Sequence, residues 1–297
     1  MAGIPFVREL KFAYGEADQV SPLIRRVICE NPGPFTYLGT GVYIIGRGEV
    51  AVIDPGPPID VHLEALKRAL AGERVTHVFT THTHMDHSPL AHPLAQWAGC
   101  KVYGIPDPSG VRDQVSLEED GEEGFAPDIL VKDGDVFTGP GWTLEAITTP
   151  GHMSNHVCYG LKEENALFSG DHIMGWSTTV ISPPDGNMGD YYRSLDKVKA
   201  RGFATLWPTH GPPVHTANAF IDAYVAHRRA REEAIIARLR AGDTKIFDMV
   251  KVIYKDVDSR LHPAAARSVL AHLIYLVEAG RVTADGPLEL SADFHAA

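Results

Sequence analysis

The residues best suited to chemistry stand in one short stretch, which reads T-H-T-H-M-D-H-S from Thr81 to Ser88. Its H-x-H-x-D-H core consists of His82, His84, Asp86 and His87. Imidazole nitrogens and carboxylate oxygens are the ligands of borderline divalent metals such as zinc. Most of the chain's 15 histidines must be ordinary surface or core residues, but so dense a cluster is hard to explain by packing. The stretch therefore predicts a metal site.

Three later turns each supply one more candidate ligand. A Pro-Gly pair precedes His152, a Ser-Gly pair precedes Asp171, and a Pro/Gly turn surrounds His210. Each turn follows a strand-like apolar run, and turn residues of this kind leave a side chain at the tip of a loop. The sequence thus predicts several loops that bring companion ligands to the first cluster.

Regular elements must position these loops. The β-branched and aromatic run 75–80 predicts a buried strand that ends just before the first histidine. Ser88 and Pro89 suit the N-cap and first residue of a following helix. Because Pro93 lacks a backbone N–H, we expect a distorted first turn or a helix start near His92. Residues 42–45 and 49–53 predict two adjacent strands with a Gly-Arg-Gly turn between them.

The series H-x-H-x-D-H, P-G-H, S-G-D and T-H-G-P resembles the metallo-β-lactamase superfamily of binuclear metal hydrolases, in that family's order. The resemblance implies an α/β fold, an αββα sandwich of two sheets packed face to face with helices outside. It also implies one metal bound by His82, His84 and His152, a second bound by Asp86, His87 and His210, and Asp171 bridging the two. Such sites keep positions open to water, as catalytic zinc requires.

Other residues refine this resemblance. Authentic zinc β-lactamases generally carry cysteine or serine where this chain has Asp171, so we expect β-lactam hydrolysis as a side activity at most. An aspartate there is the pattern of thioesterase-like, glyoxalase-like, lactonase-like and nuclease-like members. Cys158 lies in a strand-like run and is predicted to be a core residue. The family pattern makes Asp54 an orienting residue near the metal loop, while its place before Pro-Gly suits a turn-forming aspartate equally well.

The chemistry expected of this site is hydrolysis. Two divalent ions about 3.5 to 4 Å apart lower the pKa of a bridging water toward about 7, which makes hydroxide available at neutral pH. We expect Asp86 to act as the catalytic residue by orienting this hydroxide, with no serine or cysteine nucleophile. His172 is either a proton donor or a packed neighbour of Asp171. Zinc is the favoured metal, although the same ligands also hold manganese or iron.

The chain has 297 residues, enough for a catalytic domain over 1–218 and a smaller module over 219–297. Helical periodicity predicts helices at 219–240, 244–254 and 263–279, followed by a hairpin with strands at 281–283 and 288–290. Three helices and a terminal hairpin predict a winged helix. This tail also resembles the extension on the β-lactamase-like-2 group, whose better-known members are endoribonucleases acting on single-stranded RNA.

Charge bears on the choice of substrate. The formal net charge is -11, with 27 basic and 38 acidic residues, whereas nucleic-acid binders usually carry an excess of cations. We therefore favour a small acyl substrate (a thioester, ester or lactone), with Met188, Tyr191 and Tyr192 as candidate contacts and the tail serving packing, dimerisation or cleft closure. The alternative is cleavage of single-stranded RNA guided by Arg228, Arg229 and Arg231.

The cellular setting is predicted from what the sequence contains and lacks. There is no basic stretch followed by an apolar core at the N-terminus and no run of about 18 apolar residues, so neither export nor a membrane span is expected. Cys29, Cys100 and Cys158 are sparse and unpaired in spacing, which suits a reducing cytoplasm. The acidic segment 113–128 predicts a solvated, flexible loop. Apolar helical faces in the tail favour a homodimer.

Overall fold

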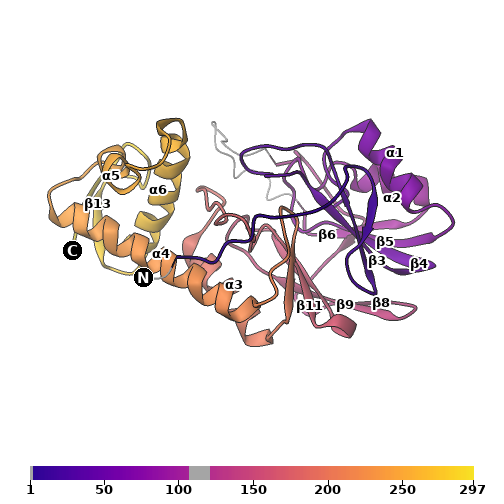
Figure 1. Cartoon of the computed structure of the whole chain (residues 1–297). Helices are drawn as coiled ribbons and strands as arrows, with labels where there is room; N and C mark the ends of the chain where they lie inside the picture. The colour runs from indigo at the N-terminus through magenta and orange to yellow at the C-terminus, as the bar shows by residue number, and fades with distance from the viewer. Residues whose placement is uncertain (1–2, 107–120) are drawn as a thin grey trace.

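The computed structural model describes residues 3–106 and 121–297 (Figure 1). Its first sheet has seven strands in chain order, antiparallel up to the fourth strand and parallel from there on. The strands are β1 (Ala17–Gln19), β2 (Ile24–Ile28), β3 (Gly41–Arg47), β4 (Glu49–Ile53), β5 (Arg74–Phe79), β6 (Lys101–Gly104) and β7 (Ile129–Leu130).

A second sheet of five strands lies against the first, in the order β12-β11-β10-β9-β8. Its neighbours are antiparallel except for β11 and β12, which run parallel. The strands are β8 (Val136–Gly139), β9 (Trp142–Thr148), β10 (Val157–Leu161), β11 (Ala166–Gly170) and β12 (Thr205–Pro208). The 3-10 turn η1 (Lys162–Glu164) joins β10 to β11.

The alternation of side chains along β3 shows how the layers form. Tyr43 and Ile45 pack into the core between the two sheets, where Phe168 of β11 meets them. Val42 and Ile44 point to the opposite face, where α1 (Asp60–Ala69) and α2 (Ala91–Ala98) cover the sheet. Successive side chains of a strand alternate between faces, so a strand covered on both sides must be apolar throughout.

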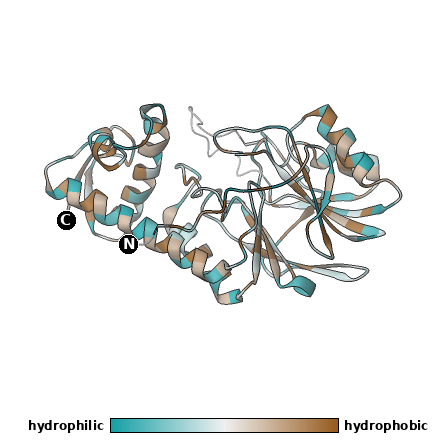
Figure 2. Cartoon of the chain, in the orientation of Figure 1, coloured by the Kyte–Doolittle hydropathy of each residue, from teal (hydrophilic) through white to brown (hydrophobic). Residues whose placement is uncertain are grey.

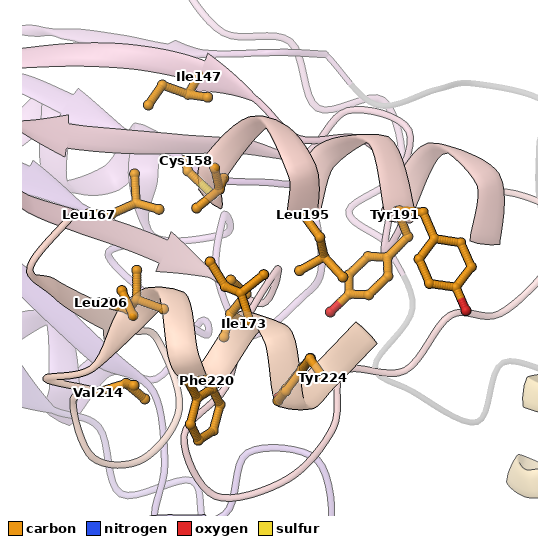
Figure 3. Packing of buried hydrophobic residues seen from close by; sticks show 14 of the residues in the cluster. Ile147, Cys158, Leu167, Ile173, Tyr191, Leu195, Leu206, Val214, Phe220 and Tyr224 are labelled. Atoms are coloured by element: carbon orange, nitrogen blue, oxygen red, sulfur yellow. The ribbon is translucent and has the colours of Figure 1, made fainter. Parts of the chain in front are cut away.

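The outer face of the second sheet is covered by α3 (Met188–Arg201) and the first half of α4 (Ala217–Arg240). Figure 3 shows Tyr191 and Leu195 of α3 facing Phe220 and Tyr224 of α4, beside strand residues such as Leu167. Helices therefore flank both sheets. This arrangement confirms the αββα sandwich expected from the sequence.

The second half of α4 packs with α5 (Ile246–Ile253), α6 (His262–Glu278) and a hairpin of β13 (Val282–Asp285) and β14 (Asp293–Ala296), and a 3-10 turn, η2 (Ser259–Leu261), precedes α6. Three helices and a hairpin confirm the winged-helix prediction (Figure 1). The placement of the second hairpin strand at 288–290 was wrong. Pro287 and Glu289 accept backbone bonds that form turns instead, and Phe294 is the residue buried in the core.

The helix α4 links the two parts of the chain. Phe220 and Ile221 near its start pack in the sandwich, whereas Ile235 and Leu239 near its end pack in the winged-helix core. The helix is continuous and starts two residues before the predicted position. The division between 218 and 219 stays a prediction, as does dimerisation through the C-terminal module.

Hydropathy along the helices fits this layered packing. Figure 2 shows α1 and α4 carrying both hydrophobic and hydrophilic residues, as expected for helices with one face on a core and one in water. Within the described parts of the chain, no helix combines the length and apolar character needed to cross a bilayer. Cys100 and Cys158 are free thiols, and Cys158 is buried in the core as predicted.

Candidate metal centre

The loop with the first histidine cluster follows β5 directly and leads into α2, which begins at Ala91. This is one residue before His92, near which a start was expected. Pro93 then occupies the first turn of the helix, where backbone N–H groups have no partner within the helix. The proline is therefore tolerated at this position of α2.

Three histidines converge at one side of the centre. The Nδ1 atom of His84 lies 3.0 Å from Nε2 of His82 and 3.2 Å from Nε2 of His152. His82 and His152 are buried, and His84 is partly exposed. The three come from two loops, one after β5 and one between β9 and β10. Their ring nitrogens together form a group able to hold one metal ion.

A second group lies beside the first. Nε2 of His210 is 2.9 Å from Oδ2 of Asp86, and Nε2 of His87 is 3.5 Å from Oδ1 of the same carboxylate. The two Nε2 atoms of His87 and His210 are 3.3 Å apart. All three residues are buried. Their ligand atoms also lie close enough together to hold one metal ion.

Asp171 stands between the two groups. Its Oδ1 is 3.5 Å from Nε2 of His210 and 3.7 Å from Nε2 of His87, and its Oδ2 is 3.9 Å from Nε2 of His152. Among the described residues, no donor makes a hydrogen bond to the buried Oδ1 atom. A buried carboxylate oxygen that accepts no hydrogen bond is rare in proteins and usually marks a bound water, a bound ion or a catalytic role. The donor set of imidazoles and carboxylates, with this oxygen between them, fits a pair of divalent cations.

Four of the imidazoles are oriented through their other nitrogen. Nδ1 of His152 contacts the Val180 carbonyl at 2.7 Å, and Nδ1 of His210 contacts the Gly39 carbonyl at 3.3 Å. A ring that donates from Nδ1 keeps Nε2 free as an acceptor or ligand. The other two contacts of this kind join His82 to Thr81 at 3.0 Å and His87 to Asp54 at 2.8 Å.

Asp54 connects three segments around the centre. Its carboxylate accepts hydrogen bonds from the backbone N and Oγ1 of Thr81, both at 2.7 Å, and from Oγ1 of Thr209 at 2.9 Å, besides its contact with His87. It is fully buried, and its φ of 50° lies in the left-handed region. Such a conformation in a residue other than glycine persists when the surroundings demand it. These contacts favour the orienting role over that of a simple turn residue.

We expect Asp54→Asn to weaken metal binding by about 10- to 100-fold, the usual effect of changing a partner that orients a metal ligand. The amide keeps the size of the side chain but loses the charge that holds Nδ1–H of His87. Zinc affinity measured by competition with a chelator checks this, with Asp60→Asn, at an exposed position of α1, as the matched control. Equal affinities for the two variants would show that Asp54 does not orient a ligand.

The electrostatics of the centre suit cation binding. Burial, together with repulsion from His152, lowers the pKa of His84 to about 3, so its ring is neutral as a ligand must be. Burial alone would raise the pKa of Asp86, but His87 and His210 outweigh it and hold that pKa at about 2. The same two histidines hold the pKa of Asp171 far below its usual range. Both carboxylates are therefore ionised at neutral pH.

Sequence reasoning missed His156, which supports the backbone of Asp171. Its Nε2 accepts a hydrogen bond from the Asp171 N–H at 3.2 Å, and its Nδ1 lies 2.8 Å from Oγ1 of Thr149. Gly170 leaves room for this contact, because a Cβ there would lie 2.6 Å from the same Nε2 atom, and its φ is 51°. The signal in the sequence was weak, since nothing distinguished His156 from any other histidine in a strand-like run.

The acidic segment 113–128 is only partly described, because residues 113–120 lie outside the described residues. The remainder contacts the metal loop and is not simply solvated. The Glu122 N–H donates to the Thr83 carbonyl at 2.6 Å, and Oγ of Ser88 donates to the Glu122 carboxylate at 2.6 Å. Glu122 thus helps to hold the loop of the first histidine cluster, which composition alone did not reveal.

Other predicted contacts are not supported. The three candidates Met188, Tyr191 and Tyr192 are buried, and the tyrosine hydroxyls already donate to the His172 carbonyl and to Glu232. His172 is itself fully buried, and burial lowers its pKa to about 3, so its ring is neutral at neutral pH and cannot act as an imidazolium acid.

The arginine patch suggested for RNA is not assembled as expected. Arg228 is buried and donates to the Thr179 carbonyl at 2.6 Å. Arg229 lies over the ring of Tyr192, and Arg231 lies over the ring of Tyr254, each at 4.0 Å. All three guanidinium groups have partners within the protein.

Comparisons with known proteins identify the family of this chain. Residues 37–210 match the family model described as "Metallo-beta-lactamase superfamily", and residues 246–287 match the "Beta-lactamase associated winged helix domain". The chain is 32% identical to a "Beta-lactamase-like protein 2 homolog" of Caenorhabditis elegans over 89% of this chain and 88% of that protein. It is also 32% identical to an "Atrochrysone carboxyl ACP thioesterase" of Paecilomyces divaricatus over 75% of this chain and 67% of that protein.

Solved structures share the fold over nearly the whole length. A beta-lactamase domain protein from Burkholderia ambifaria superposes with a TM-score of 0.80 at 20% identity, covering 99% of this chain and 97% of the other. A metallo-beta-lactamase family protein from Thermus thermophilus gives 0.77 at 22% identity, covering 94% and 100%. The chain therefore belongs to the metallo-β-lactamase superfamily of metal-dependent hydrolases and resembles its β-lactamase-like-2 group, with a winged-helix domain at its C-terminal end.

Proposed function

We propose that this protein is a two-zinc hydrolase of small acyl substrates, with thioesters as the preferred class. The observation that carries the proposal is the position of Asp171, with one oxygen near His87 and His210 and the other near His152. A carboxylate in this position suits a bridge between two ions. One ion would be held by His82, His84 and His152, and the other by Asp86, His87 and His210.

When bound, two divalent ions supply an acidic water for attack at neutral pH and positive charge opposite the oxyanion that develops. The side chains of the protein orient the attacking water and the metal ligands. Asp86, ionised at neutral pH, accepts a hydrogen bond from the attacking water and so orients it. Asp54 and the carbonyl of Val180 hold the rings of His87 and His152 in place. The candidate groups at the centre are histidines and aspartates, and with water as the attacking group no serine or cysteine nucleophile is needed.

Several observations support an acyl substrate over RNA. Two relatives, 32% and 31% identical to this chain over the aligned residues, are named as carboxyl ACP thioesterases, which act on an acyl thioester. The chain has a formal net charge of -11, which repels a polyphosphate backbone. Arg228 is buried, and Arg229 and Arg231 are engaged with aromatic rings. The aspartate at the bridging position makes β-lactam hydrolysis at most a side activity.

The experiment is a screen of the zinc-loaded protein against N-acetylcysteamine thioesters, aryl esters, lactones, a chromogenic β-lactam and single-stranded RNA. We expect the highest kcat/KM on a thioester. In His84→Ala, kcat/KM should fall by at least about 100-fold. Loss of a metal ligand lowers activity more than loss of a residue that only orients a ligand. His215→Ala, a change of an exposed histidine, should have no effect.

Two results would overturn this proposal. Cleavage of single-stranded RNA that depends on His84, without thioester hydrolysis, would identify a nuclease. Thioester hydrolysis that His84→Ala leaves unchanged would exclude the proposed metal centre as its cause.

A further inference from the structure

The segment after Asp171 is bound by two side chains of α4. The hydroxyl of Tyr224 donates to the Met174 carbonyl at 2.6 Å and also contacts the Ser177 carbonyl. Nη2 of Arg228 donates to the Thr179 carbonyl at 2.6 Å. Residues four apart lie on the same face of a helix. One face of α4 therefore holds several carbonyls of segment 174–179.

This segment continues into the metal centre. The carbonyl of Val180, one residue beyond the bond to Arg228, accepts from Nδ1 of His152 at 2.7 Å. In addition, Oγ1 of Thr179 donates to the His172 carbonyl at 3.1 Å, next to Asp171 in the chain. The position of the Thr179 and Val180 peptides thus decides where the ring of His152 points.

Arg228 is an unusual residue for a merely structural contact. It is only 3% exposed, and its described contacts are the Thr179 carbonyl and the ring of Tyr191, 4.6 Å from the guanidinium carbon. Neither partner carries a full negative charge, so burial of this cation is costly. Tyr191 in turn donates to the His172 carbonyl at 2.7 Å. Both contacts of Arg228 lead to segments that adjoin candidate ligands.

The next turn of α4 contacts the C-terminal module. Glu232 is fully buried, accepts from the hydroxyl of Tyr192 at 2.6 Å, and pairs with Arg229 at 2.9 Å. The guanidinium of Arg281, which immediately precedes β13, lies 3.8 Å from the same carboxylate. This cluster joins α3, α4 and the winged-helix hairpin. It keeps α4 in the position from which Arg228 reaches segment 174–180.

We propose that Arg228 is a positioning residue for the metal centre, acting through the Thr179 and Val180 peptides on the ring of His152. The winged-helix module supports this contact by holding α4, which gives it a role that requires no nucleic acid. The inference rests on the proposed function in one respect, namely that His152 is a metal ligand. It does not depend on which acyl substrate is used.

The test compares Arg228→Met with Arg231→Met in the full chain. Both changes remove one guanidinium from α4, but Arg231 lies over Tyr254, away from the segment. In Arg228→Met we expect zinc affinity, measured by chelator competition, to fall by about 10-fold or more. Arg228→Lys can still donate to the Thr179 carbonyl and should restore part of that affinity. Equal affinities of Arg228→Met and Arg231→Met would overturn the proposal.

A second measurement separates positioning from loss of fold. In the zinc-loaded protein, the Nδ1–H proton of His152, identified by its absence in His152→Ala, should give a slowly exchanging NMR signal because Val180 accepts it. In Arg228→Lys this proton should exchange faster while Tm stays within a few degrees of the wild type. Unchanged exchange in that variant would also overturn the proposal, even if Arg228→Met does not fold. If His152→Ala keeps full zinc content, the proposed metal function fails instead.

Discussion

Replacing Asp86 by alanine is expected to lower kcat/KM by at least about 10³-fold, which corresponds to about 4 kcal/mol of transition-state stabilisation. The carboxylate lies 2.9 Å from Nε2 of His210 and 3.5 Å from Nε2 of His87, and its pKa of about 2 keeps it ionised. Its loss removes a candidate metal ligand and the acceptor that orients the attacking water at once. A centre of this kind supplies several kcal/mol to hydrolysis.

The control for this prediction is Asp196→Ala, which removes an exposed carboxylate from α3. Both variants should show the circular dichroism of the folded wild-type protein at 25 °C when zinc is in excess. Steady-state kinetics on the best substrate of the screen provides the measurement. If Asp86→Ala kept more than a tenth of the wild-type kcat/KM, the assigned role of Asp86 would be wrong.

Removal of metal is expected to abolish hydrolysis and to lower the melting temperature. Without cations, the ionised carboxylates of Asp86 and Asp171 stay buried beside imidazoles that can satisfy them only in part. A ligand present at about 1,000 times its Kd stabilises the folded state by about 4 kcal/mol. For a domain of this size, that is a shift in Tm of roughly 8 to 16 °C.

Calorimetry and activity assays before and after chelation measure this effect. Zinc should restore both the activity and Tm, whereas magnesium should not, because five of the candidate ligands are imidazoles and magnesium prefers oxygen. Full hydrolysis by protein with no measurable metal would contradict the expectation.

The candidate ligands could be predicted from the sequence because the signals that mark them are local. His82, His84, Asp86 and His87 follow one strand directly, and each of the later candidates sits in its own Pro/Gly or Ser/Gly turn. Strand ends and tight turns depend mainly on nearby residues. The order of the motifs along the chain predicted that these loops would meet at one edge of the sandwich. The structure brings all seven candidate side chains together, and their role as metal ligands stays a prediction.

The supporting residues were harder to predict because their roles arise from tertiary contacts. His156 supports Asp171 only through the pairing of β10 with its neighbours, and Arg228 reaches Thr179 only because α4 lies across the second sheet. An arginine among charged helix residues looks solvent-exposed in a sequence. Its burial here depends on the rings of α3, which no local pattern reveals.

The measurement closest to the central claim is a zinc titration of metal-free protein, with bound zinc and thioester hydrolysis followed on the same samples. We expect saturation at two zinc ions per chain, hydrolysis that is absent without zinc, and an Asp171→Ala variant that no longer binds both ions tightly. Saturation at one ion or none, or hydrolysis that does not depend on zinc, would contradict the account of this protein as a two-metal acyl hydrolase.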